Sequence, residues 1–250
     1  LSNLNTDELE RVTTVVVDQA AGDVPVYAGV GASGTLEAVE RAERAAAAGA
    51  DRLISVTPYF LETDQSGLYD HYARLADATD LPLLLYHLPS MTGQTLEVDT
   101  VADVATTLDT VVGLKDSSGD LTWGSRVMAN TPDDFAYLQG LGSLLLPSLV
   151  LGADGGVTGT ANVAPDPLLT VYDAYRAGEL DRARAVQMET VTPLANALMG
   201  GTFPAGFKTG ARLAGRDLGV TRPPARGYSE TERASLRDTM DSLGLLAPDR

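Results

Sequence analysis

The 250-residue sequence contains no cysteine and only two histidines, His71 and His87. Without cysteine the chain forms neither a disulfide nor a thiolate metal site. Two histidines leave few ligands for a histidine-rich metal centre and few partners for a histidine-based catalytic triad. No apolar run reaches membrane-spanning length, and no signal peptide opens the sequence. We therefore expect a cytoplasmic protein with no metal site and no membrane partner.

Positive charge is scarce as well. The chain carries 34 acidic residues against 18 basic ones, which gives a net charge of −16. This charge repels phosphates and argues against nucleic acid as a partner. Only two of the basic residues, Lys115 and Lys208, are lysines, and the others are arginines. High acidity with so little lysine is typical of proteins adapted to high salt, where screening relieves the self-repulsion.

The sequence does contain a regular alternation of short apolar runs and amphipathic segments. The apolar runs predict six strands, at residues 24–31, 51–58, 81–89, 111–115, 135–139 and 155–160. Helical periodicity predicts helices around them, up to about residue 21 and then at 36–48, 66–79, 96–108, 121–129, 143–151, 165–175, 181–198, 203–213 and 229–242. Strands that alternate with helices in this way indicate βαβ units and a parallel sheet.

Two α/β architectures fit this alternation. In a (β/α)8 barrel the carboxyl ends of the strands form the catalytic face, and in an open doubly wound sheet they form the ligand crevice. The polar residues of interest lie at such strand ends in either case. The sequence shows six strands, whereas a closed barrel requires eight.

Lys115 is the first candidate for chemistry. It follows the buried run Val111–Leu114 and precedes the turn residues Asp116–Gly119. An ammonium at the end of an apolar strand is poorly solvated, which favours the neutral amine, and a neutral amine can form a Schiff base with a ketone. The alternative is a lysine that extends from a strand end to a surface carboxylate. The stretch alone does not decide between the two.

Tyr86 is the second candidate, because it closes the preceding strand on the same rim. A phenol there could move protons to and from a Schiff base, although a tyrosine that anchors its hydroxyl on the backbone is the commoner case. Its neighbour His87 should face the helices, by strand alternation, and we interpret it as structural. Gly29–Gly34 is a weak match to a dinucleotide loop and fits better a loop kept slim beneath a pocket. Lys208, on a C-terminal helix, is assigned a surface or interface role.

Four motifs carry a resemblance to a known family. They lie in order at residues 57–60 (Thr-Pro-Tyr-Phe), 86–93 (Tyr-His-Leu-Pro-Ser-Met-Thr-Gly), 113–119 (Gly-Leu-Lys-Asp-Ser-Ser-Gly) and 159–163 (Gly-Thr-Ala-Asn-Val). The sequence resembles the dihydrodipicolinate synthase/N-acetylneuraminate lyase family, the class I Schiff-base pyruvate aldolases on a TIM barrel. The resemblance covers essentially the whole chain. It implies a barrel at 1–176, a C-terminal helical extension at 177–250, no cofactor, and a homo-oligomer, either dimer or tetramer.

The resemblance also assigns roles to residues. Lys115 matches the Schiff-base lysine and Tyr86 the proton-relay tyrosine. Val157 matches the residue that lines the pyruvate methyl and carboxylate pocket, Gly140 the small residue that ends the preceding strand, and Tyr59 a rim position. Family members begin with two further strands and a Gly-Thr-Thr loop that binds the pyruvate carboxylate. We therefore expect the printed chain to lack the first two strands of the barrel.

Two further departures bear on the substrate. Dihydrodipicolinate synthases carry an arginine for the second substrate's carboxylate where this chain has Met91, and a second tyrosine, lent across a subunit interface, where it has Phe60. Loss of a guanidinium at a carboxylate site is not a neutral change. The sequence thus favours a 2-keto-3-deoxygluconate aldolase of a halophile, acting on the free or 6-phosphorylated sugar acid. The alternatives are a dihydrodipicolinate synthase, an N-acetylneuraminate lyase-type aldolase, or a non-catalytic 2-oxo-acid-binding relative.

Overall fold

The computed structural model describes residues 3–248, which form two compact units that divide between Leu138 and Gln139. Each unit is described by itself. Within the described residues, no helix is long and apolar enough to cross a membrane.

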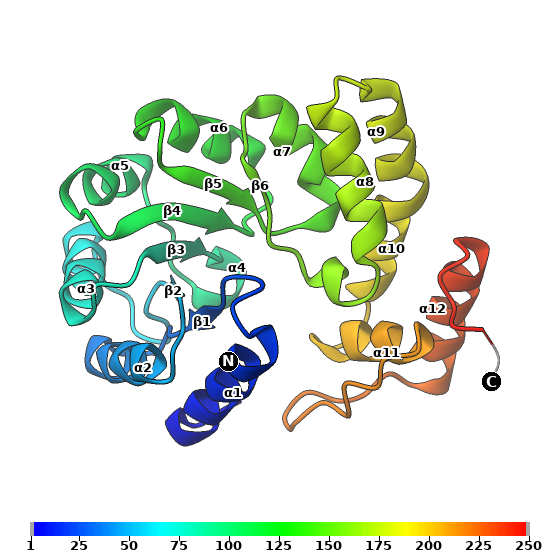
Figure 1. Ribbon diagram of the computed structural model, residues 1–250, viewed down its shortest axis with the longest axis horizontal. Helices are drawn as coiled ribbons and strands as arrows, with labels where there is room; N and C mark the ends of the chain where they lie inside the picture. Colours follow the sequence, from blue (N-terminus) through cyan, green and yellow to red (C-terminus); the bar gives the residue numbers. More distant parts are fainter. Residues whose placement is uncertain (1–2, 249–250) are drawn as a thin grey trace. The chain divides into compact units, whose positions relative to one another are not determined.

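The first unit is built on parallel strands (Figure 1). These are β1 (Tyr27–Gly29), β2 (Arg52–Val56), β3 (Leu83–His87), β4 (Val111–Asp116) and β5 (Ala136–Gln139). The pairs β1–β2, β2–β3 and β3–β4 are parallel, and the order of strands in the sheet follows the chain as far as β6 (Gly155–Gly156). A parallel sheet in chain order, with a helix after each strand, is the arrangement of a TIM-barrel-type α/β fold.

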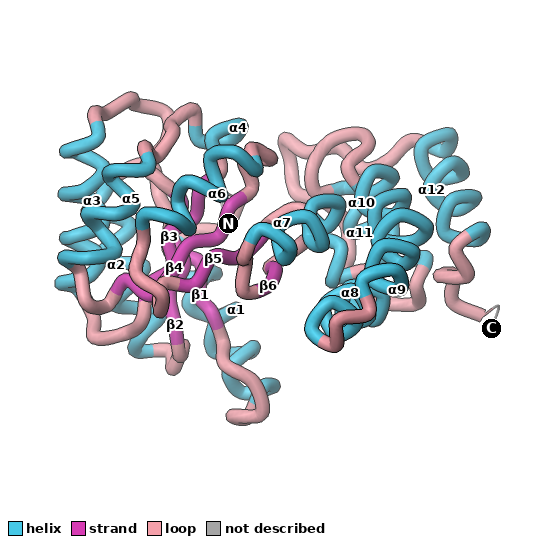
Figure 2. Tube along the Cα trace, turned by 90° about the horizontal axis from the view of Figure 1, so that it is seen from above, coloured by secondary structure: helices cyan, strands magenta, loops and turns pink. Residues whose placement is uncertain are grey.

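Helices cover the strands of the first unit. They are α1 (Thr6–Ala20), α2 (Thr35–Ala47), α3 (Gln65–Ala78), α4 (Pro89–Thr92), α5 (Val98–Thr107) and α6 (Leu121–Asn130). In Figures 1 and 2, α2, α3 and α5 lie in a row along the outside of the strands. The strands contain fully buried residues, such as Leu53, Leu85 and Leu114. In β3 and β4 consecutive residues are buried, so both faces are largely covered, which explains why these strands read as continuous apolar runs.

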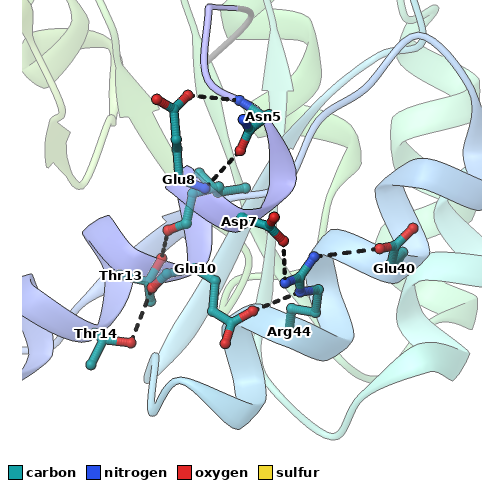
Figure 3. Close-up of polar contacts among 9 residues, drawn as sticks. Asn5, Asp7, Glu8, Glu10, Thr13, Thr14, Glu40 and Arg44 are labelled. Carbon is teal, nitrogen blue, oxygen red and sulfur yellow. Dashed lines mark hydrogen bonds and ion pairs between the residues drawn. The ribbon is translucent and has the colours of Figure 1, made fainter.

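Arg44 fastens α1 to α2 (Figure 3). Its guanidinium lies 2.6 Å from both Asp7 and Glu10 on α1, and 3.6 Å from Glu40 on its own helix. Asn5 begins α1 with a capping box, in which its side chain accepts from the Glu8 N–H. The ion pairs of Arg44 are largely exposed, so added salt should weaken them.

The second unit is mainly helical. It contains α7 (Leu145–Leu151), α8 (Pro165–Arg176), α9 (Leu180–Val186), α10 (Thr192–Leu198), α11 (Ala205–Leu213), α12 (Glu230–Ser242), the 3₁₀ segments η1 (Gly142–Leu144) and η2 (Gly159–Asn162), and the π-helical segment η3 (Gln187–Val191). One core contains Leu149 of α7 and Val171 of α8, and another contains Leu198 of α10 and Met240 of α12. The predicted C-terminal helices are confirmed.

Several predicted boundaries were wrong. The strand predicted at 24–31 is only three residues long, and the one predicted at 155–160 ends at Gly156 and is followed by η2. The single helix predicted at 181–198 contains the π turn η3, just before Pro193. Because proline has no N–H and crowds the carbonyl four residues earlier, a wider turn accommodates it. The one-turn helix α4, which begins at Pro89, was not predicted.

Candidate active site

Tyr86 and Lys115 lie side by side at the carboxyl ends of β3 and β4. The two residues are register partners in the parallel pair, and Lys115 Nζ is 4.0 Å from the centre of the Tyr86 ring. Both side chains are half-buried. The structure therefore brings together the amine and the phenol that the sequence had placed on one rim.

The close approach of β4 to its neighbours depends on Gly113. A Cβ at this position would lie 2.4 Å from the Ala136 carbonyl oxygen on β5 and 3.0 Å from Leu84 on β3. Such distances are too short for any side chain, so only glycine lets the three strands pack at this spacing. Two residues later the same strand presents Lys115.

Ser117 adds a hydroxyl to this pair. Its Oγ donates a hydrogen bond of 3.3 Å to the Tyr86 hydroxyl, and its N–H donates to the His87 carbonyl at 2.9 Å. The side chain is buried. Because side chains alternate along an extended chain, Lys115 and Ser117 share the face on which Tyr86 lies. The sequence interpretation treated Ser117 as a turn residue and missed this contact.

Asp116 points to the opposite face, where it is buried and fully hydrogen-bonded. It accepts from the Tyr137 hydroxyl at 2.7 Å and from the Ser118 N–H at 2.8 Å and Oγ at 3.1 Å. Burial raises the pKa of Tyr137, and the bond to Asp116 raises it further. Gly124 of α6 makes room for this phenol, since a Cβ there would lie 2.3 Å from the Tyr137 hydroxyl. Asp116 thus holds the end of β4 in place from the face opposite to Lys115.

His87 belongs to the same structural face. Its ring stacks on Trp123 of α6 with centroids 4.0 Å apart and an interplanar angle of 21°. Burial lowers its pKa, and the nearby carboxylates of Asp116 and Asp120 only partly oppose this effect. A neutral, stacked imidazole that faces the helices agrees with the structural role predicted for it.

Tyr59 lies in the loop that follows β2 and is half-buried. Its neighbour Phe60 is 92% exposed and has a φ of +80°, a left-handed conformation that is rare for a residue with a side chain. Gln94, which follows β3 and α4, makes hydrogen bonds to the backbone of this loop. Met91 is exposed on the neighbouring loop. The sequence interpretation did not single out Gln94.

Gly140 and Val157 lie in the second unit, where Gln139 is bonded to Val157 and to Leu141, the residue after Gly140. The Gln139 carbonyl accepts from the Val157 N–H at 2.9 Å, and its side chain accepts from the Leu141 N–H at 2.8 Å. The Gln139 amide also donates to Ser148 at 2.7 Å. Val157 is 44% exposed.

Two cavities of the described residues lie elsewhere. One of about 260 Å³ is lined by residues 95–99, Trp123 and Arg126, and one of about 670 Å³ by residues around the start of α8 and Arg216. Neither is lined by Tyr86 or Lys115, so the candidate site rests on the strand-end geometry. A primary amine, a phenol and a serine hydroxyl within contact distance provide a nucleophile and a proton relay.

Known proteins match the chain over nearly its whole length. The sequence profile described as the Dihydrodipicolinate synthetase family matches residues 1–243. An uncharacterised DapA-like lyase of Halobacterium salinarum is 43% identical over 243 residues, 97% of this chain and 79% of that protein. A 4-hydroxy-tetrahydrodipicolinate synthase of Methanopyrus kandleri is 40% identical over 245 residues, which is 98% of this chain and 81% of that enzyme.

Solved structures agree with the sequence comparison. Dihydrodipicolinate synthase from Aquifex aeolicus superposes with a TM-score of 0.95 at 30% identity, over 99% of this chain and 84% of that one. The E. coli K12 prophage protein YagE, solved in complex with pyruvate, superposes with a TM-score of 0.93 at 27% identity. The match covers 98% of this chain and 83% of that one. The chain belongs to the dihydrodipicolinate synthetase family. It is a class I, metal-independent carbon–carbon lyase with the TIM-barrel fold of that family.

Proposed function

We propose that this member of the dihydrodipicolinate synthetase family cleaves 2-keto-3-deoxygluconate, free or 6-phosphorylated, to pyruvate and glyceraldehyde or its 3-phosphate. The observation that carries the proposal is the position of Lys115 Nζ, 4.0 Å from the centre of the Tyr86 ring, with Ser117 on the Tyr86 hydroxyl. Lys115 is the nucleophile and Tyr86 the proton relay. Gly140, Val157 and Tyr59 are the proposed substrate contacts.

The reaction follows from these groups. The Lys115 amine adds to the C2 ketone, and loss of water leaves an iminium ion. Tyr86 takes the proton of the C4 hydroxyl as the C3–C4 bond breaks, and the electron pair of that bond passes to the iminium nitrogen. The aldehyde leaves, and the remaining enamine is protonated at C3. Hydrolysis of the resulting iminium releases pyruvate and restores the lysine.

The residues beyond Tyr86 support a sugar acid as substrate. Met91 is 54% exposed where the dihydrodipicolinate synthases have an arginine for a carboxylate, and it can form no ion pair. Phe60 stands in place of their second tyrosine and lacks its hydroxyl. The loop residues Leu61, Glu62 and Thr63 provide no positive charge for a phosphate.

A second candidate is supported by the relatives' names. The Methanopyrus kandleri relative, at 40% identity, is a 4-hydroxy-tetrahydrodipicolinate synthase, as is one from Haloarcula marismortui at 37%. The same Schiff base with pyruvate would then condense with aspartate semialdehyde. In either case we propose a cytoplasmic homo-oligomer that acts on small 2-oxo acids.

Trapping at Lys115 tests the shared step. Borohydride with pyruvate should reduce the Schiff base and add the mass of pyruvate less one water and plus two hydrogens to the Lys115 peptide. Lys115→Arg keeps the charge but loses the nucleophile and should give no adduct, whereas Lys208→Arg should trap as the wild type does. An untrapped wild-type protein that still binds pyruvate in calorimetry would mark the chain as a non-catalytic binding relative.

Two assays then separate the substrates. Release of pyruvate from 2-keto-3-deoxygluconate, and from its 6-phosphate, would support the first proposal. Consumption of pyruvate only with aspartate semialdehyde would instead assign the chain to the synthases. Release of pyruvate only from N-acetylneuraminate would assign it to that type of aldolase.

A further inference from the structure

We propose that Gln94 is a positioning residue that shapes the part of the active site facing the aldehyde-bearing half of the substrate. Its buried amide holds residues 58–63, the loop that carries Tyr59 and Phe60, in one conformation. This inference rests on the proposed aldolase function. We expect Gln94 to affect the steps that need the aldehyde-bearing half of the substrate, and not the formation of the Schiff base at Lys115.

The side chain of Gln94 is 6% exposed and is bonded entirely to loop backbone. Its Nε2 donates to the Pro58 carbonyl at 2.7 Å and to the Leu61 carbonyl at 3.4 Å, and its Oε1 accepts from the Thr63 N–H at 3.0 Å. Two carbonyls and one N–H specify a single orientation of the amide. No other residue type has two donors and one acceptor in this planar arrangement except asparagine, which is one methylene shorter.

Pro58 is buried and Tyr59 half-buried at the start of the loop, but its tip is not packed. Phe60 and Leu61 are 92% and 74% exposed, so packing does not fix their backbone. Phe60 also adopts a φ of +80°, which a residue with a side chain holds only when its surroundings require it. The hydrogen bonds from Gln94 to Pro58, Leu61 and Thr63 lie on both sides of Phe60, and they hold its backbone in this conformation.

The position of the loop decides which part of the reaction it affects. The loop begins at Pro58, two residues after Val56, which is the register partner of Tyr86 on β3. Gln94 itself is reached from β3 through α4 and a turn at Gly93, where φ is +75°. Gln94 therefore ties the loop after β2 to the loop after β3. Its side-chain hydrogen bonds within residues 3–248 reach the loop and not β4, the strand of Lys115.

Gln65 is a matched control in the same region. Its amide also joins the connections after β2 and β3, since Nε2 donates to Thr95 O at 2.9 Å and Oε1 accepts from Glu97 N at 3.0 Å and Thr100 Oγ1 at 2.8 Å. None of these bonds reaches residues 58–63. A variant at Gln65 thus removes as many hydrogen bonds without releasing the loop.

The test compares a half-reaction with the whole reaction. Exchange of the pyruvate C3 protons in D2O requires only the Schiff base and enamine at Lys115, whereas pyruvate release from 2-keto-3-deoxygluconate also requires the far half of the substrate. Gln94→Met keeps the length of the side chain and removes its hydrogen bonds, and Gln94→Glu keeps only the acceptor for Thr63. Each is measured beside Gln65→Met, with thermal unfolding to confirm that the variants are folded.

We expect the exchange rate to stay within about twofold of wild type in all variants. For cleavage, Gln94→Met should raise KM about tenfold, the equivalent of one to two net hydrogen bonds, while Gln65→Met should not. Gln94→Glu should raise KM at least as much as Gln94→Met, because its second carboxylate oxygen would face the carbonyls of Pro58 and Leu61. Backbone amide exchange across residues 58–63 should be faster in the Gln94 variants and unchanged in Gln65→Met, a readout that does not depend on activity.

Two outcomes would overturn the inference. Equal KM values in wild type and Gln94→Met would show that the loop conformation does not affect substrate binding. A parallel loss of pyruvate exchange and of cleavage in Gln94→Met would show that Gln94 supports the whole site rather than its far half. Absence of pyruvate exchange in the wild type is a different failure, since it refutes the proposed function and leaves the amide-exchange result as the test of the loop.

Discussion

His71 gives the sharpest prediction about stability. The ring lies on α3, 1% exposed, with Nδ1 2.9 Å from the Thr35 hydroxyl of α2. Burial lowers its pKa from 6.5 to about 4. The folded state therefore binds a proton less readily than the unfolded state, and stability is lost as the pH falls from about 6.5 towards 4. In this window the loss is about 1.4 kcal/mol at pH 5.5 and about 2 kcal/mol at pH 5, relative to pH 7.5.

Urea unfolding of wild type and His71→Phe at pH 7.5, 6.5, 5.5 and 5.0 would test this value. Phenylalanine keeps an aromatic ring beside Tyr72 but cannot take up a proton, so the variant should lose about 1.4 kcal/mol less than wild type between pH 7.5 and 5.5. At pH 7.5 it should be less stable by about 1 kcal/mol, because Thr35 loses its partner. His87 is buried too and contributes to the slope of both proteins, so their difference isolates His71. Parallel curves for the two proteins would refute the reasoning.

Three further predictions concern the strand ends. Gly113→Ala should destabilise the protein by about 2–4 kcal/mol, because its Cβ would overlap the backbone of β5, and an urea midpoint equal to wild type would contradict the packing described. Ser117→Ala should lower kcat for cleavage by roughly tenfold, because the Tyr86 hydroxyl loses its hydrogen-bond partner. Borohydride should still trap pyruvate on Lys115 in this variant. An unchanged kcat would show that Ser117 takes no part in the proton relay. Tyr137→Phe should cost about 1.5–3 kcal/mol in urea unfolding, because buried Asp116 loses a charge-assisted bond, and a neutral effect would mean that Asp116 is satisfied without it.

The central strands of the first unit follow from the sequence, because β3 and β4 are largely buried on both faces. Residues 83–87 and 111–116 appear in the sequence as apolar runs that end in a polar residue, so strand type and strand end are both predictable. The pairing of one strand with another is harder to predict, because it depends on residues far apart in the sequence. The pairing of Tyr86 with Lys115 depends on chain-order packing and on a register shift between Leu83 and Leu84, and neither has a signal within one strand.

The residues that were missed act through backbone atoms. Gln94 binds the carbonyls of Pro58 and Leu61, which lie 36 and 33 positions away in sequence. A carbonyl is present at every position, so no residue type marks it as a partner, and only the folded loop brings it within reach. Strand alternation did contain the signal for Ser117, because it predicts that residues 115 and 117 share a face. The turn composition around it obscured that signal.

Residues 115–118, Lys-Asp-Ser-Ser, have different roles on the two faces of the β4 strand end. Lys115 and Ser117 face Tyr86, while Asp116 turns away and is held by Tyr137 and Ser118. An amine that must attack a ketone gains from an immobile backbone, because misplacement by an ångström costs rate steeply. A carboxylate with several hydrogen bonds behind the strand provides that rigidity without contacting the substrate. The acidic residue next to the lysine is therefore best understood as an anchor, and exchange of its partners should change stability before it changes chemistry.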